Sequence, residues 1–479
     1  MRISSLVAFS IVAAFLLVQG CSAPQEKPEP VLPHATADAL SLPVLKGSTR
    51  LSIMSWPDQH WWEQWHDQQL NALVNAAIHE HPDMAVAKAR LAVARAQADL
   101  FESANGPELD ASASVNHERF SANSYIPPPY GGKVYDDTFL GLNGHWNLDL
   151  WGKQRALIKA ELGEVRARQF ESMAVEQALA ADVVRTYVLY QLDGQRRELI
   201  LERSGLIRLQ TALKHAQAQA GIQAGDEQIQ PHVQLLDQNE SAEQLDAALN
   251  LLKVRLQALT GISARTLHLH AVGLPEIVPG LPGQASINLL GRRPDLAAAR
   301  ERVYAHWNQL HAAHQAFYPD IRLNALLGFS SLQISKLINS GSLVAGVQPA
   351  LTLPLFDSGM LKQSWAIEDA SLQQAIAQYR SLLTQSILDV QQSLLGVQSA
   401  DAQLAILHKR LAQLDEAEHD ARIRYQAGFT DAEPVLQAEQ SILDLQGRVL
   451  DRRQQELAAY LDLIQALGGG FHDSRQVHQ

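Results

Sequence analysis

The chain has 479 residues, of which 46% are hydrophobic and 19% are charged, a composition typical of a folded protein. The formal net charge is -12 at pH 7, from 51 acidic and 39 basic residues. Phosphate backbones are bound by clustered Lys and Arg, and the sequence contains no such cluster, so this balance argues against nucleic acid as a partner.

The N-terminus has the features of a secreted lipoprotein. A basic start and an apolar run from Leu6 to Val18 predict a signal peptide over residues 1–20, which is too short to span a membrane. Cys21 is the single cysteine, so it has no partner for an internal disulfide, and its place after Gly20 resembles a bacterial lipobox. In this interpretation Cys21 carries diacylglycerol and palmitate, and several acyl chains together give stable anchoring. The alternative is an ordinary signal peptide that is cut near Gly20 and leaves Cys21 unmodified.

Residues 21–50 are predicted to form the lipidated N-terminal tether. Five prolines lie within this segment and favour an extended chain. By resemblance to sorted lipoproteins, Ser22 at the second mature position favours the outer membrane. No later segment has the roughly 18 consecutive apolar residues of a membrane helix, so any part of the body that enters a membrane must do so with strands.

The sequence repeats itself once, which indicates an internal duplication. His81–Lys88 matches Arg293–Arg300, and Gln219–Gly221 matches Gln426–Gly428. Two further pairs of segments fall between them in the same order. The offset is roughly 210 residues, which is too long a period for a solenoid.

Each half predicts the same order of elements: a helix, a strand pair, a very long helix, a glycine turn and a return helix. Apolar residues in the long and return helices recur at alternating steps of three and four, which indicates coiled-coil packing. A helix of the predicted length measures roughly 100 Å, more than a globular core can use. The predicted helices are 82–103, 153–220 and 228–259 in the first half, and 294–317, 360–427 and 434–467 in the second.

Four segments alternate between apolar and polar residues, as strands tilted across a bilayer do. Four strands cannot close a barrel, and an open edge leaves backbone groups unpaired in lipid. Membrane strands here would therefore require several chains to share one barrel. The apolar positions are Leu109, Ala111, Ala113 and Val115; Leu140, Leu142, Trp146, Leu148 and Leu150; Ile321, Leu323, Ala325, Leu327 and Phe329; and Ala345, Val347, Leu351, Leu353 and Leu355.

These predictions divide the chain along its length. After the signal peptide and tether come an equatorial segment with the first helix (51–107), the first transmembrane strand pair (108–150), the first long helical hairpin (151–262), an equatorial linker (263–293), the repeat helix (294–318), the second transmembrane strand pair (319–356), the second long helical hairpin (357–467) and a C-terminal tail (468–479).

Several motifs together resemble the outer membrane factor family of the TolC and OprM type, and within it the NodT-like efflux lipoproteins. The resemblance covers essentially the whole mature chain, in order. The motifs are the lipobox, Trp56-Pro57, Trp61-Trp62, Arg292-Arg293-Pro294-Asp295-Leu296, Phe317-Tyr318-Pro319, Leu353-Pro354-Leu355-Phe356-Asp357 and Gly468-Gly469-Gly470.

The resemblance implies a mainly α fold with transmembrane β-strands. Three chains would share one twelve-stranded β-barrel, four strands from each, above a long α-helical periplasmic barrel and a mixed equatorial domain. It also implies a homotrimer in outer-membrane lipid that docks to a periplasmic adaptor (membrane fusion) protein and an inner-membrane efflux pump. The implied activity is passive export of drugs or other small toxic molecules, and hence antibiotic resistance.

The resemblance places adaptor docking at the two glycine turns. The candidate docking residues are Gly221 and Ile222 at the first turn and Gly428, Phe429 and Thr430 at the second. Both glycines also predict a helix cap with a positive φ angle.

The family often closes its tunnel with acidic residues just after the second turn. The aligned run here, Pro434 to Gln437, lacks both acids. Asp431, Glu433 and Glu439 lie nearby and form the candidate periplasmic gate, where a charge ring would favour cations. An ordinary solvated surface is an equal alternative for these three carboxylates.

Residue patterns for catalysis and for metal binding are missing from the sequence. The 18 histidines show no zinc-ligand spacing, and no nucleophile or phosphate-loop motif is present. We therefore expect no enzyme activity, no metal and no cofactor beyond the lipid on Cys21. Two alternatives to an efflux channel remain: the outer-membrane channel of a type I protein-secretion system, and a periplasmic coiled-coil structural lipoprotein without a pore.

Overall fold

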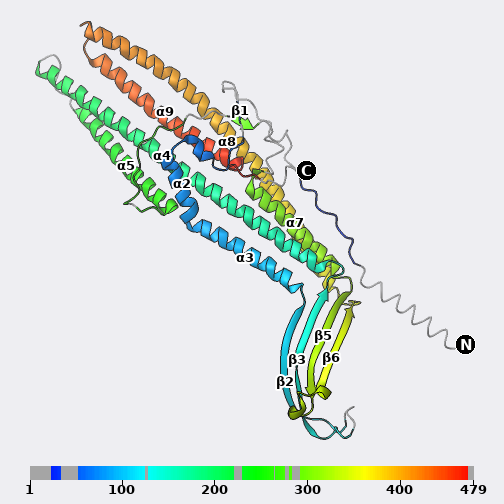
Figure 1. The fold of residues 1–479 in the computed structure, drawn as a ribbon. Helices are drawn as coiled ribbons and strands as arrows, with labels where there is room; N and C mark the ends of the chain where they lie inside the picture. The colour runs from blue at the N-terminus through cyan, green and yellow to red at the C-terminus, as the bar shows by residue number, and fades with distance from the viewer. Residues whose placement is uncertain are drawn as a thin grey trace. The chain divides into compact units, whose positions relative to one another are not determined.

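The computed structural model describes residues 23–33, 52–54, 56–123, 128–220, 229–263, 265–275, 280–282 and 292–472. Helices make up most of these residues, and the strands include one four-stranded sheet (Figure 1). Contacts divide the chain into two compact units. The first contains Met1–Leu32, Arg90–Arg168 and Ala299–Tyr379, and the second contains Pro33–Ala89, Gln169–Ala298 and Arg380–Gln479.

The order of elements repeats once, as the sequence predicts. The first half runs through α3 (Pro82–Ala104), β2 (Glu108–Arg119), β3 (Val134–Leu148), α4 (Lys153–Gln219) and α5 (Ile229–Thr260). The second half runs through α7 (Pro294–Gln315), β5 (Asp320–Ser331), β6 (Leu343–Thr352), α8 (Met360–Gln426) and α9 (Glu433–Ala466). All six predicted helices are confirmed, with ends that agree to within about two residues, the usual uncertainty of a helix boundary.

Both long helices have 67 residues and begin after an aspartate that caps them. The carboxylate of Asp149 accepts the backbone amides of Gln154 (3.1 Å) and Arg155 (2.9 Å) at the start of α4. Asp357 accepts the amide of Leu361 (2.7 Å) at the start of α8. Neither helix contains proline, so each ladder of backbone hydrogen bonds runs on unbroken.

The first unit contains the sheet and closely packed helix segments. The strands are antiparallel in the order β2-β3-β5-β6, so the strand pairs of the two repeats meet through β3 and β5. Gly163 of α4 lies against Ala305 of α7, and a Cβ at position 163 would be 3.1 Å from the Ala305 Cβ. The guanidinium of Arg166 donates to Glu301 across the same contact (2.6 Å). A small residue and an ion pair therefore hold α4 and α7 together.

Two predicted strand ends are wrong. We expected the apolar alternation to continue to Leu150 and to Leu355, whereas β3 ends at Leu148 and β6 at Thr352. Pro354 has no N–H to donate to a strand ladder, and Asp149 caps α4 instead of pairing. At its other end, β3 begins at Val134.

The second unit has a hydrophobic core around α4. Tyr187 is fully buried, and its hydroxyl donates to the carboxylate of Asp67 (2.5 Å). Asp67 also caps α2 (Gln68–Glu80) by accepting the amides of Gln69 and Leu70. Burial and the hydrogen bond to Asp67 raise the pKa of Tyr187. The largest buried side chains around it are Trp62, Leu70, Leu192, Leu256, Leu457 and Leu461.

Two small elements complete the second unit. A 3-10 helix, η3 (Trp61–Trp65), carries the tryptophans of the core. A short parallel pair joins β1 (Ser52–Met54) to β4 (Gly280–Pro282). Among the described residues, none of the helices combines the length and the apolar character needed to cross a membrane.

Candidate functional site

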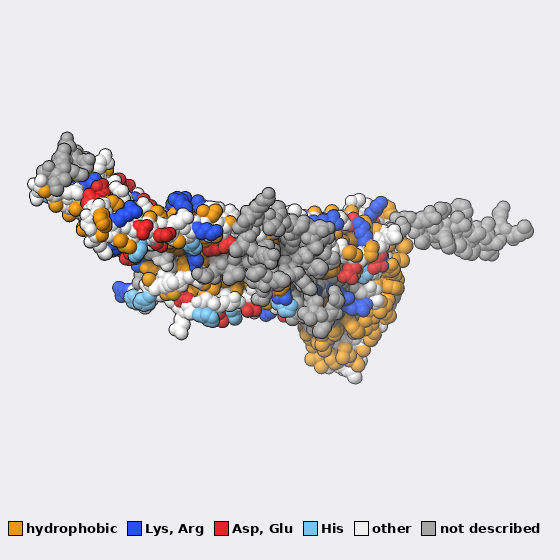
Figure 2. Space-filling model, turned by 90° about the horizontal axis from the view of Figure 1, so that it is seen from above, with side chains coloured by type: hydrophobic (Ala, Val, Ile, Leu, Met, Phe, Trp, Pro, Cys, Tyr) orange, Lys and Arg blue, Asp and Glu red, His pale blue; other side chains and the backbone are white. Residues whose placement is uncertain are grey.

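One face of the four-stranded sheet is apolar and exposed. The register places alternate residues of all four strands on this face. Leu109 is 70% exposed and Val347 is 70% exposed. Hydrophobic side chains cover this part of the molecule (orange, lower right in Figure 2). The face consists of Leu109, Ala111, Ala113, Val115, Leu140, Leu142, Trp146, Leu148, Ile321, Leu323, Ala325, Leu327, Phe329, Leu343, Ala345, Val347 and Leu351.

The opposite face of the sheet is mostly polar, although it also carries Phe139, Leu326 and Val344, and it is partly cross-linked by hydrogen bonds. Asn143 donates to Ser112 on the neighbouring strand (2.7 Å), and Arg322 donates to Asn147 (3.0 Å). The acidic side chains outnumber the single arginine on this face. Its polar residues are Glu108, Asp110, Ser112, Ser114, Asn116, Glu118, Asp137, Asn143, His145, Asn147, Asp320, Arg322, Asn324, Ser330, Gln348 and Thr352.

Aromatic side chains lie at both ends of the sheet. At the end nearest the helices, Trp151 donates to the carbonyl of Pro319 (2.8 Å) and stacks on Tyr318 with ring centroids 5.3 Å apart. At the far end, Tyr135 contacts the rings of Phe120 (5.7 Å) and Tyr130 (5.8 Å). Rings with one polar atom are favoured where an apolar phase meets water. An aromatic cluster therefore lies at each end of the sheet, and the pairing of Tyr135 with Glu118 puts Tyr135 on the polar face.

The second glycine turn is a Schellman cap. The amide of Phe429 donates to the carbonyl of Arg424 (2.9 Å), and the amide of Gly428 donates to Tyr425 (3.0 Å). Gly428 has φ +75°, and a Cβ there would meet nothing within 4 Å. The Phe429 side chain is 84% exposed, and Thr430 follows it in the turn. The positive φ angle of Gly428 is the helix cap that the sequence predicts, whereas a docking role for this turn stays a prediction.

The three candidate gate acids have different hydrogen-bond partners. The Asp431 carboxylate accepts the backbone amide of Glu433 (3.2 Å), and Glu433 accepts a hydrogen bond from Gln437 (3.4 Å). Glu439 is paired with Arg422 of α8 (2.8 Å). Glu418 also accepts from Arg422 (2.6 Å) and raises the pKa of that guanidinium. Asp431 thus shapes the turn, and Glu439 ties α9 to α8.

Three of the sequence-predicted residues lie outside the described residues. These are Cys21, the candidate lipid anchor, and Gly221 and Ile222 of the first turn. Within the part of the chain that the structure describes, no group of three or more His, Cys, Asp and Glu side chains is arranged to hold a metal ion.

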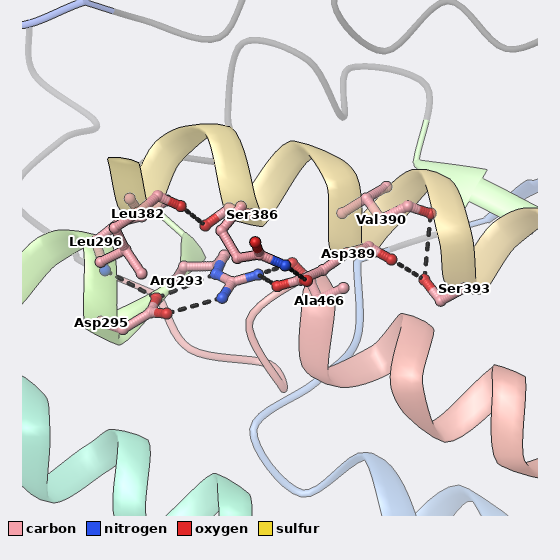
Figure 3. A network of polar contacts seen from close by, with 10 residues as sticks. Arg293, Asp295, Leu296, Leu382, Ser386, Asp389, Val390, Ser393 and Ala466 are labelled. Atoms are coloured by element: carbon pink, nitrogen blue, oxygen red, sulfur yellow. Dashed lines mark hydrogen bonds and ion pairs between the residues drawn. The ribbon is translucent and has the colours of Figure 1, made fainter. Parts of the chain in front are cut away.

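Sequence reasoning missed an ion network around Arg293, whose side chain is only 11% exposed, drawn in Figure 3. Arg293 donates to Asp295 through two guanidinium nitrogens (3.1 and 2.8 Å), to Asp389 of α8 (3.3 Å) and to the carbonyl of Ala466 at the end of α9 (3.3 Å). Burial alone would lower the pKa of Arg293, but the carboxylates of Asp295 and Asp389 outweigh it and raise the pKa. The Arg-Pro-Asp motif therefore joins the start of α7 to α8 and α9.

The sequence profile of the family described as "Outer membrane efflux protein" matches residues 73–262 and 286–469, which include both repeats. The chain belongs to the outer membrane efflux protein family. Its sequence is 33% identical to the multidrug resistance outer membrane protein MdtQ of Escherichia coli, over 98% of this chain and 99% of that protein.

Solved structures of outer-membrane proteins have the same fold. The outer membrane protein VceC of Vibrio cholerae matches with a TM-score of 0.77 and 28% identity, over 87% of this chain and 100% of that chain. The outer-membrane channel OprN matches with a TM-score of 0.81 and 24% identity, over 94% and 99% of the two chains. The protein is thus an outer-membrane efflux channel, as the sequence predicts, and its family is one of transport proteins.

Proposed function

We propose that this chain is the outer-membrane exit duct of a three-component efflux system that exports drugs or other small toxic molecules. The observation that carries the proposal is the sheet, which has an apolar face, a polar face and an aromatic cluster at each end. Such a sheet matches a bilayer on one side and water on the other. The drug cargo is inferred from the relative MdtQ, which is described as a multidrug resistance protein.

The duct requires several copies of the chain. The outer edges of β2 and β6 have no partner strand in the described sheet, and unpaired backbone groups are costly in lipid. Joining β6 of one copy to β2 of the next removes every edge when the ring closes. Three copies, the number that the family resemblance implies, would give a closed twelve-stranded barrel lined by the polar face.

The helical tips are the proposed docking site of a periplasmic adaptor, which connects the duct to an inner-membrane pump. The exposed Phe429 and the open turn at Gly428 and Thr430 support this assignment for the second tip. Gly221 and Ile222 would do the same at the first tip. Asp431 and Glu433 remain candidates for a gate at this end, whereas the bond between Glu439 and Arg422 favours a clamp between helices for Glu439.

Cys21 is the proposed lipid anchor, with diacylglycerol and palmitate on the mature N-terminus. Acylation would add a membrane attachment beside that of the sheet. We do not propose catalysis; the energy for export would come from the pump.

The proposal is tested by deleting the gene from its own host and measuring accumulation of a panel of fluorescent drugs. We expect accumulation to rise in the deletion strain and to fall again when the intact chain is restored. Unchanged drug accumulation with loss of a secreted protein from the medium would favour type I protein secretion instead.

A further inference from the structure

A short segment near the N-terminus lies along α7 in the first unit. The Nε2 atom of His314 donates to the carbonyl of Pro24 (2.9 Å), and Nδ1 of His311 lies 2.9 Å from a carboxylate oxygen of Glu26. The indole of Trp307 donates to the carbonyl of Lys27 (3.4 Å). Residues 24–29, here called the strap, therefore make successive contacts along one helix.

The strap and the helix match in length. Positions 304, 307, 311 and 314 are spaced by three and four residues, so they form one stripe of α7. This stripe is about 15 Å long, and the strap, which contains Pro24 and Pro28, spans about 16 Å as a polyproline-type chain. At the other end of the strap, Glu29 faces Tyr304, the last position of the stripe. Burial and then the negative charge of Glu29 raise the pKa of Tyr304.

Contacts with α8 and burial fix the strap further. The ammonium group of Lys27 pairs with Asp369 (2.5 Å) and lies over the Trp365 ring, 5.5 Å from its centroid. Leu32, just beyond the strap, is buried. A loose tether needs none of these contacts, because proline alone keeps a linker extended.

The first contact of the strap, at His314, lies next to the aromatic pair at the end of the sheet nearest the helices. His314 touches the Tyr318 ring edge-on (5.8 Å), and Tyr318 stacks on Trp151. Cys21 lies outside the described residues, three positions before Pro24 in the sequence, and three residues of extended chain span at most about 11 Å. The proposed acyl chains would therefore start close to the aromatic pair at which the apolar face of the sheet begins.

We propose that the strap is a ruler that holds the lipid anchor at the level of the Trp151–Tyr318 pair, so that acyl chains and strands enter the membrane at one height. This inference rests on the proposed lipidation of Cys21. A ruler of this kind would favour assembly of the sheet from several chains, since each chain would present its strands at the same depth.

Docking of the strap is tested by a cysteine pair in otherwise intact membranes. Glu26→Cys with His311→Cys should form a disulfide under mild oxidation, because these side chains touch in the structure. The matched control, Glu26→Cys with Tyr304→Cys, is two helical turns out of register and should not. Equal cross-linking of the two pairs, or none in either, would overturn the docked register.

The proposed positioning role of the strap is tested by substitutions that remove its contacts with α7 and α8, both in the intact chain and in a chain without Cys21. Lys27→Ala combined with Trp307→Ala should lower the yield of heat-stable oligomers in the outer membrane several-fold. Lys253→Ala, which removes a similar contact with the Tyr190 ring (5.6 Å) from the other unit, should leave the yield unchanged. In a Cys21→Ser background the effect of undocking should disappear, because there is no anchor to position.

A loss of the same size in both backgrounds would mean that the strap only braces α7 and α8, and the ruler would be wrong. Lipidation itself is checked separately by the mass of the mature N-terminus. A free thiol at Cys21 in the intact protein would contradict the anchor proposal, and the ruler with it, while leaving the channel proposal standing.

Discussion

Three consecutive glycines after α9 all have positive φ angles, and two of them lie directly against backbone. The amides of Gly468 and Gly469 donate to Gln465 and Ile464 and close α9 with a Schellman cap. A Cβ at Gly470 would lie 2.0 Å from the carbonyl oxygen of Asp58. The chain therefore needs glycine here for conformation and for space.

We expect Gly470→Ala to lower the free energy of unfolding by about 3 kcal/mol or more, since backbone must move to admit the methyl group. Thermal unfolding of the detergent-solubilised protein measures the change. Gly447→Ala is the control, because Gly447 lies inside α9 with nothing within 4 Å of an added Cβ. If Gly447→Ala lowered the free energy of unfolding as much as Gly470→Ala does, the steric explanation would be wrong.

Gly428 also has a positive φ angle, but nothing lies within 4 Å of a Cβ added there. Gly428→Trp should cost about 1–2 kcal/mol from the left-handed conformation and leave the folded oligomer intact. Drug efflux should be abolished, because the bulky ring would fill the proposed adaptor groove. Gly359→Trp carries similar strain at φ +87°, at the start of α8, and should retain efflux. Normal efflux by Gly428→Trp would contradict the docking assignment.

At the residue scale, sequence could identify the glycine turn at Gly428 but not the partners of the charged side chains. A Gly between two long helical patterns predicts a positive φ cap on its own. The bond between Glu439 and Arg422 depends on how α8 and α9 align, and the Arg293 network joins segments nearly a hundred residues or more apart. Such pairings come from tertiary packing and carry no local signal.

At the scale of elements, the first helical hairpin is tied by an exposed bidentate ion pair. Arg197 of α4 donates to both oxygens of Asp246 of α5 (2.5 and 3.2 Å). The hydrogen bond from Arg197 is the main cause that holds the pKa of Asp246 below its usual value. The charged carboxylate is therefore favoured in the folded hairpin.

The pKa of Asp246 is lower in the folded hairpin than in the unfolded chain, so the ion pair stabilises the hairpin fully at neutral pH. This stabilisation is lost as the pH falls through the acidic range below the usual aspartate pKa. We expect amide hydrogen exchange near Asp246 to quicken on acidification. Arg197→Met should remove most of this pH dependence, and Arg203→Met, which removes a different ion pair of α4 with Asp444, should not. The same acid response in Arg197→Met would show that another group is responsible.

The periodic pattern predicted the long helices well, because alternating apolar steps persist over many turns. The same kind of pattern predicted the strands to be too long, because it included Leu150, Leu353 and Leu355. The apolar alternation continues past the residues at which backbone pairing stops. Pro354 was the available signal for the end of β6. The prolines of the strap predict only an extended tether. Nothing local to residues 24–29 indicates that they contact α7.

At the scale of the whole molecule, the described residues of one chain provide four strands of the proposed membrane sheet, whose outer strands β2 and β6 each have one edge without a partner strand. The internal repeat explains how the sheet is built, because each half supplies one antiparallel pair and β3 joins β5 between them. The same duplication gives each chain two long helical hairpins. Closure of the proposed barrel would thus be a property of the oligomer and not of the chain.

The most direct measurement is single-channel conductance of the purified protein in a planar bilayer, together with its mass in detergent. We expect a trimer mass and discrete, long-lived openings, because in our proposal three four-stranded sheets would close into one water-filled barrel. A monomer mass with no conductance would contradict the shared barrel, and the exposed apolar face of the sheet would then need a different partner from lipid.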